Sequence, residues 1–291
     1  MKWRGGQRSD NVVDVRGSGR RGGLGGGGGK LGLGGIAAVV VISLLLGKNP
    51  MEMLGLVNQI TGGTAPVQQE GAPPPQNDEA AEFVRVILGE TELVWTEVFQ
   101  QAGRQYEIPK LILFSGGVDS ACGSATSASG PFYCPGDHQV YLDMSFFKDM
   151  EQKLGGGGDF AYAYVIAHEV GHHVQTLMGV SAKVNAARRA GQNVQGDGGL
   201  LVRQELQADC LAGVWANRSE KKLQWLETGD VEEALNTATA IGDDRLQKQS
   251  QGHVVPDAFS HGTSEQRVRW FRNGFESGDP NRCDTFAARQ L

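Results

Sequence analysis

The stretch Phe160-Ala-Tyr-Ala-Tyr-Val-Ile-Ala-His-Glu-Val-Gly-His-His-Val-Gln-Thr-Leu-Met178 decides the fold of this chain. Apolar residues run through most of it, which predicts a buried helix with Asp159 as its N-cap and Gly179 at its C-terminal end. A His-Glu-His cluster inside such a helix is costly to bury unless it has a function. The helix therefore indicates a polar site inside a folded core.

That polar cluster has the H-E-x-x-H pattern. His168 and His172 are four residues apart, so on a helix they lie about 40° apart around the axis and both imidazoles can reach one metal ion. Glu169 lies beside them and can act as the general base on a water molecule that the metal holds. The pattern is typical of zinc-dependent peptidases.

A third ligand is expected downstream, because a catalytic zinc usually keeps three protein ligands and one open position. Glu205 and Asp209 are four residues apart and share a helix face with Ala208 and Ala212, whose small side chains allow a second helix to approach closely. We predict that Glu205 binds zinc and that Asp209 accepts the outer N–H of a ligand histidine. The alternative is a charged pair on a solvated helix face.

The order of these motifs resembles two groups of zinc peptidases. H-E-x-x-H followed by E-x-x-x-D resembles the gluzincins, the thermolysin-like branch, and the E-x-x-A-D form is similar to membrane-anchored peptidases related to the CaaX-prenyl proteases. Over essentially its whole length the chain resembles the bacterial neutral zinc metallopeptidase family, which implies an anchored zinc peptidase and leaves its substrate open. The stretches that carry this resemblance are CGSA at 122–125, GPFYCP at 130–135, HEVGHHVQ at 168–175, ELQADCLAGVWA at 205–216, HGTSEQR at 261–267 and CDTF at 283–286.

Peptide hydrolysis also needs a donor for the oxyanion that develops on the substrate carbonyl. Gluzincins supply a His or Tyr from the C-terminal part of the domain, and this resemblance points to His261, which with Arg267 is similar to the His-to-Arg element of the anchored peptidases. The alternative for His261 is a solvated loop histidine, and Tyr133 is the second candidate for the donor. His173 lies about 140° from His168 around the helix and is expected to miss the metal.

The N-terminal residues predict a membrane anchor. Residues 1–30 hold seven Lys/Arg against two Asp, and they are Gly-rich without apolar periodicity, so we expect a disordered basic arm. Residues 31–47 carry no charge and are at the short end for a bilayer span. The positive-inside rule then places the arm in the cytoplasm. The expected location is the inner (plasma) membrane, crossed once, with the catalytic domain outside the cytoplasm, periplasmic or extracellular.

Other interpretations of the N-terminal residues are disfavoured. A cleaved signal peptide would need a shorter basic region and a small-x-small cleavage site after Leu46, and a buried core helix is a further option. Arg20-Arg21 is only a poor match to a twin-arginine export signal. Nucleic acid is not an expected partner, because the first 50 residues carry a net charge of +6 and residues 51–291 one of −12.

All four cysteines, Cys122, Cys134, Cys210 and Cys283, follow the expected anchor. Their even number favours disulfides and an oxidising compartment. Three pairings are possible and spacing alone does not choose among them. The favoured set joins Cys122 to Cys134, which would close a short turn-rich loop, and Cys210 to Cys283. Metal binding by the cysteines is disfavoured, because no C-x-x-C spacing occurs.

The rest of the chain divides into a linker and one domain. Residues 48–77, rich in Gly, Pro and Gln, are the expected linker, and residues 78–291 the expected zinc metallopeptidase domain. Asp78 is expected to cap a helix, 111–114 and 139–142 are expected strands, and Asp230 and Thr263 each begin a capping-box pattern. The predicted class is α+β: a zincin-like, helix-dominated domain with a small sheet, preceded by one transmembrane helix.

Together these observations predict a membrane-anchored zinc endopeptidase that acts on a protein or peptide substrate, with Zn²⁺ held by His168, His172 and Glu205. Two alternatives stay open. One is a zinc-stabilised, non-catalytic envelope scaffold or binding module, against which the intact Glu169 argues. The other is a zinc amide hydrolase that acts on non-protein envelope substrates through the same residues. The sequence does not determine the oligomeric state.

Overall fold

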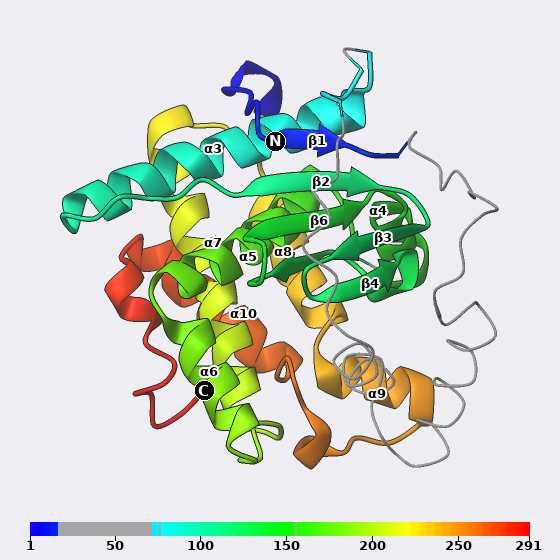
Figure 1. Ribbon diagram of the computed structural model, residues 1–291, viewed down its shortest axis with the longest axis vertical. Helices are drawn as coiled ribbons and strands as arrows, with labels where there is room; N and C mark the ends of the chain where they lie inside the picture. The colour runs from blue at the N-terminus through cyan, green and yellow to red at the C-terminus, as the bar shows by residue number, and fades with distance from the viewer. Residues whose placement is uncertain (17–71, 76, 155) are drawn as a thin grey trace, which may run out of the picture.

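The apolar helix that carries the H-E-x-x-H pattern is α5, Asp159–Leu177. A computed structural model describes residues 1–16, 72–75, 77–154 and 156–291. In it, α5 packs against α7 (Leu200–Leu223), α8 (Asp230–Ala240) and α3 (Glu79–Gln101). These helices form one layer beside a small sheet (Figure 1). The predicted α+β class, rich in helix with a small sheet, is confirmed.

The main sheet has four strands in the order β1 (Val12–Asp14), β2 (Lys110–Phe114), β6 (Gln139–Asp143) and β5 (Phe132–Cys134). β1, β2 and β6 are parallel, and β5 is antiparallel to β6. Both predicted strands are therefore present at the centre of the sheet. A separate hairpin joins β3 (Gly117–Ser120) to β4 (Gly123–Thr126).

Both faces of the two central strands are buried, as expected for strands within a parallel sheet. Leu111 and Leu113 of β2 belong to the main core shared with the helices, whereas Ile112 and Phe114 belong to a second, smaller cluster on the other face. The side chains of β2 alternate between these two cores, because successive residues of a strand point to opposite faces.

The remaining elements surround these two layers. They are α4 (Ser145–Asp149), a π-helix (Met150–Leu154), α6 (Val180–Arg189), α9 (Asp243–Gln251), α10 (Ser264–Ser277) and the 3₁₀ turns Trp3–Gly5, Ser127–Ser129, Pro256–Ala258 and Pro280–Cys283. Disulfides join Cys122 to Cys134 and Cys210 to Cys283, which confirms the favoured pairing. The second disulfide connects α7 to the C-terminal 3₁₀ turn.

Two helix starts agree with the sequence because the capping side chain keeps its local contact. Asp78 accepts the backbone N–H of Ala81, and Thr263 begins a complete capping box at α10. The capping box expected at Asp230 is wrong: Gly229 is the N-cap, and the Asp230 carboxylate accepts the Glu227 N–H at 2.7 Å and contacts the α-amino group of Met1 at 3.3 Å.

Asp159 is not the predicted N-cap of α5 either. Gly158 takes that position, and the Asp159 carboxylate accepts the indole N–H of Trp3 at 3.1 Å. At the starts of α5 and α8, the carboxylates of Asp159 and Asp230 contact residues near the N-terminus and do not cap their helices. Tertiary packing therefore overrides the local capping pattern.

Residues 1–16 are ordered, so the disordered arm predicted over residues 1–30 is wrong for this part. β1 extends the main sheet beside β2 (Figure 1). Trp3 is buried with its ring edge-on to Phe83 of α3. Arg8 pairs with Glu82 of α3 at 2.7 Å, and Asn11 donates to Glu92 at 2.9 Å. Basic and polar residues that looked solvated in the sequence meet carboxylates of α3.

The position of β1 contradicts the membrane topology that was predicted from the charge of the N-terminal residues. Residues 12–14 share one sheet with residues 110–114 and 139–143, so they lie on the same side of any membrane as the domain. A cytoplasmic arm with the domain outside is incompatible with that pairing. The membrane span predicted over residues 31–47 lies outside the described residues. Among the residues that are described, no helix is both long and apolar enough to cross a bilayer.

α10 packs directly on α7, because glycines allow their backbones to meet. A Cβ atom added at Gly274 of α10 would lie 1.9 Å from the carbonyl oxygen of Cys210 on α7, so no larger residue fits there. This close approach brings α10, with Arg267 in its first turns, against the helix that carries Glu205 and Asp209.

Candidate metal centre

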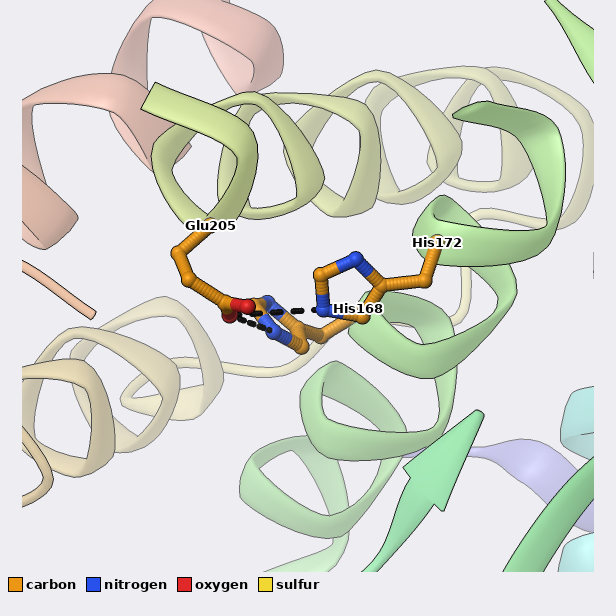
Figure 2. A group of neighbouring side chains, drawn as sticks. All are labelled: His168, His172 and Glu205. Atoms are coloured by element: carbon orange, nitrogen blue, oxygen red, sulfur yellow. Dashed lines mark hydrogen bonds and ion pairs between the residues drawn. The ribbon is translucent and has the colours of Figure 1, made fainter. Parts of the chain in front are cut away.

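Three of the predicted site residues converge between α5 and α7. Figure 2 shows His168 and His172 on one helix and Glu205 on the other, with their side chains pointing toward one another. Oε2 of Glu205 lies 3.1 Å from Nε2 of His168 and 3.3 Å from Nε2 of His172. One possible ligand atom from each residue falls within 4.8 Å of the other two. The structure thus assembles the three residues that were predicted to bind zinc.

The spacing of these atoms fits a zinc ion. Ligands held at about 2.0–2.2 Å in tetrahedral geometry lie about 3.3–3.5 Å from one another. The Glu205–histidine separations are close to that range, and two imidazoles with one carboxylate is a donor set of catalytic zinc sites. The side chains of His168, His172 and Glu205 are 8%, 14% and 18% exposed, so solvent still reaches the group. Such a partly open site suits a catalytic metal better than a closed structural one.

A glycine allows α5 and α7 to come this close. Gly171, between the two histidines, faces Ala208 of α7, and a Cβ atom added to it would lie 3.1 Å from the Ala208 carbonyl oxygen. The predicted role of Ala208 in close helix packing therefore needs Gly171 as its counterpart. Larger residues at either position would separate Glu205 from the histidines.

Asp209 makes the predicted contact with the outer nitrogen of a histidine. Its Oδ1 is 2.8 Å from Nδ1 of His168, on the opposite side of the ring from Glu205. Arg267 donates to both Asp209 oxygens, each at 2.9 Å, and the Tyr164 hydroxyl donates to Oδ1 at 2.6 Å. Asp209 is fully buried. A buried carboxylate is stable only when it is paired and hydrogen-bonded, and these contacts provide both.

The electrostatics of the site favour positive charge. Burial lowers the pKa of His168, but Asp209 and Glu205 more than offset it and raise the pKa to about 10. Burial likewise lowers the pKa of His172, and Glu205 raises it overall. Burial raises the pKa of the Glu205 carboxyl, yet the two histidines bring it well below its usual range. The pocket therefore attracts either protons on the histidines or a divalent cation.

Glu169 lies next to His168 on α5, beside this group. It is 8% exposed, and its carboxylate forms no hydrogen bond or ion pair with any residue that the structure describes. A carboxylate that is nearly buried without a partner is unfavourable on its own. This is the arrangement expected of a base that works on a substrate or a water molecule.

His261 lies in the loop before α10, where Asp243 orients it. Nδ1 of His261 is 3.3 Å from Oδ1 of Asp243, and Oδ2 accepts the backbone N–H groups of Ser260, His261 and Gly262 at 2.6–3.1 Å. Burial lowers the pKa of His261, but Asp243 and Glu205 raise it overall. The His261 side chain is 51% exposed, so its ring is accessible to solvent while Asp243 restricts its orientation.

Asp243 was missed by the sequence analysis. Asp243 begins α9 directly after Gly242, a position at which a carboxylate is common because it stabilises the helix N-terminus. Its local sequence therefore did not indicate a role in the site. Its contacts with residues 260–262 depend on the fold and have no local pattern.

Tyr133 and His173 pair with each other away from Glu205. The Tyr133 hydroxyl lies 3.1 Å from Nδ1 of His173, and Nε2 of His173 lies 2.6 Å from the Glu107 carbonyl oxygen. His173 is fully buried and is not among the residues whose possible ligand atoms converge. Burial raises the pKa of Tyr133 to about 12. In the structure, Tyr133 therefore packs beside α5 with its hydroxyl on His173.

Comparisons with known proteins agree with the motifs. The family model described as "Putative neutral zinc metallopeptidase" matches residues 1–286. The chain is 50% identical over 289 residues to "Uncharacterized protein YpfJ" of Escherichia coli (strain K12), covering 98% of this chain and 99% of that protein. It is 46% identical over 196 residues to a protein of Mycobacterium tuberculosis (strain ATCC 25618 / H37Rv), covering 64% and 65%. No solved structure matches the chain significantly. From its motifs and this family match, the chain belongs to the neutral zinc metallopeptidase family.

Proposed function

We propose that this protein is a zinc-dependent endopeptidase whose active site is built from α5, α7 and the loop before α10. One observation carries the proposal: the donor atoms of His168, His172 and Glu205 converge, while Glu169, next to His168 on α5, forms no hydrogen bond or ion pair within the part of the chain that the structure describes. A purely structural metal site would need the three ligands and would gain nothing from an unpaired carboxylate beside them.

Each residue would then have a distinct role. When bound, Zn²⁺ would supply Lewis-acid chemistry, polarising the substrate carbonyl and making a water molecule more acidic. Glu169 would take a proton from the attacking water and pass it to the leaving nitrogen. His261, oriented by Asp243, would donate from Nε2 to the developing oxyanion. Asp209 would keep the N–H of His168 on Nδ1, so that Nε2 faces the metal.

We also propose that the domain works outside the cytoplasm. Two disulfides support this, because such bonds persist in oxidising compartments. A single membrane crossing at residues 31–47 is not part of this proposal, because it would separate β1 from β2, with which β1 pairs in one sheet. A protein or peptide is the proposed substrate class, as the family description suggests.

The decisive experiment compares the full chain with Glu169→Gln. Removal of a general base commonly lowers turnover by about 10²–10⁴-fold, and Gln keeps the size of the side chain, so zinc content and thermal stability should stay near wild type. Glu265→Gln, at a carboxylate whose side chain is 83% exposed, is the matched control and should change nothing. Newly formed N-termini in cells that express each form would report the cleavage.

The scaffold alternative makes the opposite prediction. A wild-type protein that retains zinc, shows no peptide or amide hydrolysis across a broad substrate library, and is fully replaced in cells by Glu169→Gln would have a structural zinc and no catalytic function. Cleavage of non-protein amides alone would favour the third interpretation, an envelope amide hydrolase.

A further inference from the structure

The two histidines of the metal-binding group have different outer partners. His168 contacts the carboxylate of Asp209, whereas Nδ1 of His172 lies 2.9 Å from Oε1 of Gln175, one turn further along α5. The Gln175 side chain is fully buried. Since Nε2 of His172 faces Glu205, Gln175 contacts the nitrogen that points away from the metal-binding group. Its amide can therefore decide which nitrogen of the ring carries hydrogen.

The orientation of the Gln175 amide is determined by its other contacts. Its Nε2 lies 2.7 Å from the backbone carbonyl oxygen of Gln204 and 3.0 Å from Oε1 of Gln207. A backbone carbonyl only accepts hydrogen bonds, so the amide nitrogen must face Gln204 and the amide oxygen must face His172. That oxygen also only accepts, so the hydrogen of His172 is placed on Nδ1. The lone pair of Nε2 is then free for a metal.

A second amide continues the chain of contacts to a disulfide. Nε2 of Gln207 donates to the backbone carbonyl of Cys283 at 2.9 Å, which places its Oε1 toward Gln175 by the same reasoning. Cys283 is bonded to Cys210, three residues after Gln207 on α7. The disulfide thus holds the Cys283 carbonyl against the helix that carries Gln207. We call Gln175, Gln207 and the Cys283 carbonyl the amide relay.

We propose that the amide relay orients His172 for metal binding and that the Cys210–Cys283 disulfide contributes to metal affinity by anchoring its far end. Gln175 is a positioning residue, since it acts through His172. The inference rests on the proposed zinc site. The relay is neutral, so it selects the tautomer of His172 without adding a further carboxylate to a pocket that already contains Glu205 and Asp209.

The first test measures zinc affinity of the full chain by competition with a chromophoric chelator. Gln175→Met keeps the length of the side chain and removes the acceptor, and loss of such an outer contact should weaken zinc binding about 10–100-fold. NMR of the zinc-loaded protein supplies an independent readout. The Nδ1–H proton of His172 should be protected from exchange with water in wild type and should exchange rapidly in Gln175→Met while the backbone amides of α5 and α7 keep their protection. That unchanged amide protection excludes loss of stability as the cause.

The second test addresses the disulfide. The pair Cys210→Ala and Cys283→Ala should lower zinc affinity in wild type and cause no additional loss when Gln207→Leu is already present, because both changes interrupt one relay. Gln207→Glu keeps the acceptor but cannot donate to Cys283, and it tests the same link if Gln207→Leu does not fold.

The other disulfide is the matched control, because no residue of the relay contacts it. Cys122→Ala with Cys134→Ala should lower stability and leave zinc affinity and the His172 resonance unchanged. Equal losses of zinc affinity from the two disulfide deletions would overturn the link between Cys283 and the metal site.

The outcomes also separate this inference from the function on which it rests. A wild-type chain that does not retain zinc would defeat the proposed function and the relay together. A wild type that binds zinc tightly, with Gln175→Met binding it within about twofold and still protecting the His172 proton, would overturn the relay alone.

Discussion

Removing the Arg267 guanidinium should cost about 3–5 kcal/mol of folding stability. Arg267 is 3% exposed and makes four hydrogen bonds, two to Asp209, one to the Tyr164 hydroxyl and one to the Ile241 carbonyl. Arg267→Met fills similar space but leaves the Asp209 carboxylate buried with its main cation gone. The quoted cost is the one typical of breaking a buried ion pair from one side.

Urea denaturation of the full chain, with far-UV circular dichroism as the readout, would measure this loss. Arg269→Met is the matched control on the same helix. Arg269 is 41% exposed in its side chain, pairs with the exposed Glu265 and donates to the carbonyl of Leu291 at the C-terminus, so its removal should cost only about 1 kcal/mol. An Arg267→Met cost within that same small range would show that the buried pair does not stabilise this fold.

Replacing both partners separates folding from metal binding. In Arg267→Met with Asp209→Leu no charge is left unpaired, and such apolar replacements are often neutral or stabilising, so most of the lost stability should return. Zinc affinity should still be about 10–100-fold lower, because Nδ1 of His168 has lost its acceptor. Wild-type zinc affinity in this double variant would refute the role assigned to Asp209.

Three further predictions follow from the contacts above. His261→Ala should lower kcat much more than it raises KM, because an oxyanion donor acts mainly in the transition state. Asp243→Asn should have the same effect in weaker form. A change confined to KM would indicate that His261 binds substrate instead. Zinc affinity should rise with pH between about 6 and 9, because the pKa of His168 is raised to about 10 and zinc must displace the proton that is bound below this value. Calorimetry in buffers of different ionisation enthalpy should show proton release on zinc binding. A zinc affinity independent of pH would contradict this prediction. Trp3→Ala should destabilise the protein by about 3 kcal/mol in chemical denaturation, since Trp3 is buried against Phe83. The control Lys2→Ala, at an exposed position, should have little effect on stability. Equal stability of the two variants would mean that residues 1–16 do not belong to the folded domain.

The parts of the candidate site that the sequence predicts are those that lie within one helix. His168 and His172, and likewise Glu205 and Asp209, are four residues apart, and helical periodicity alone places each pair on one face. The apolar flanks of the first pair predict burial for the same reason. The side chains of Asp78 and Thr263 predict helix starts, because each accepts a backbone N–H only three positions further along the chain.

Predictions failed where a residue's partner is distant in the chain. Asp159 and Asp230 have the local appearance of caps, but both carboxylates contact residues 1–3. The basic composition of residues 1–16 resembles a solvated arm, yet β1 pairs with a strand about a hundred residues later, and a parallel partner at that distance leaves no local pattern.

The sequence by itself therefore determined which residues are candidates for the chemistry: two histidines and a glutamate as possible ligands, Glu169 as a possible base and Asp209 as an outer carboxylate, all from their spacing along helices. Only the tertiary structure decided the arrangement that makes a site of them. It brought α5 against α7 at Gly171 and Ala208, placed Asp243 behind His261, and linked His172 through two amides to the Cys210–Cys283 disulfide. Apart from the His172–Gln175 contact within α5, these contacts join residues 18 to 76 positions apart. They exist because of which helices pack together, a property of the whole core and of no single segment.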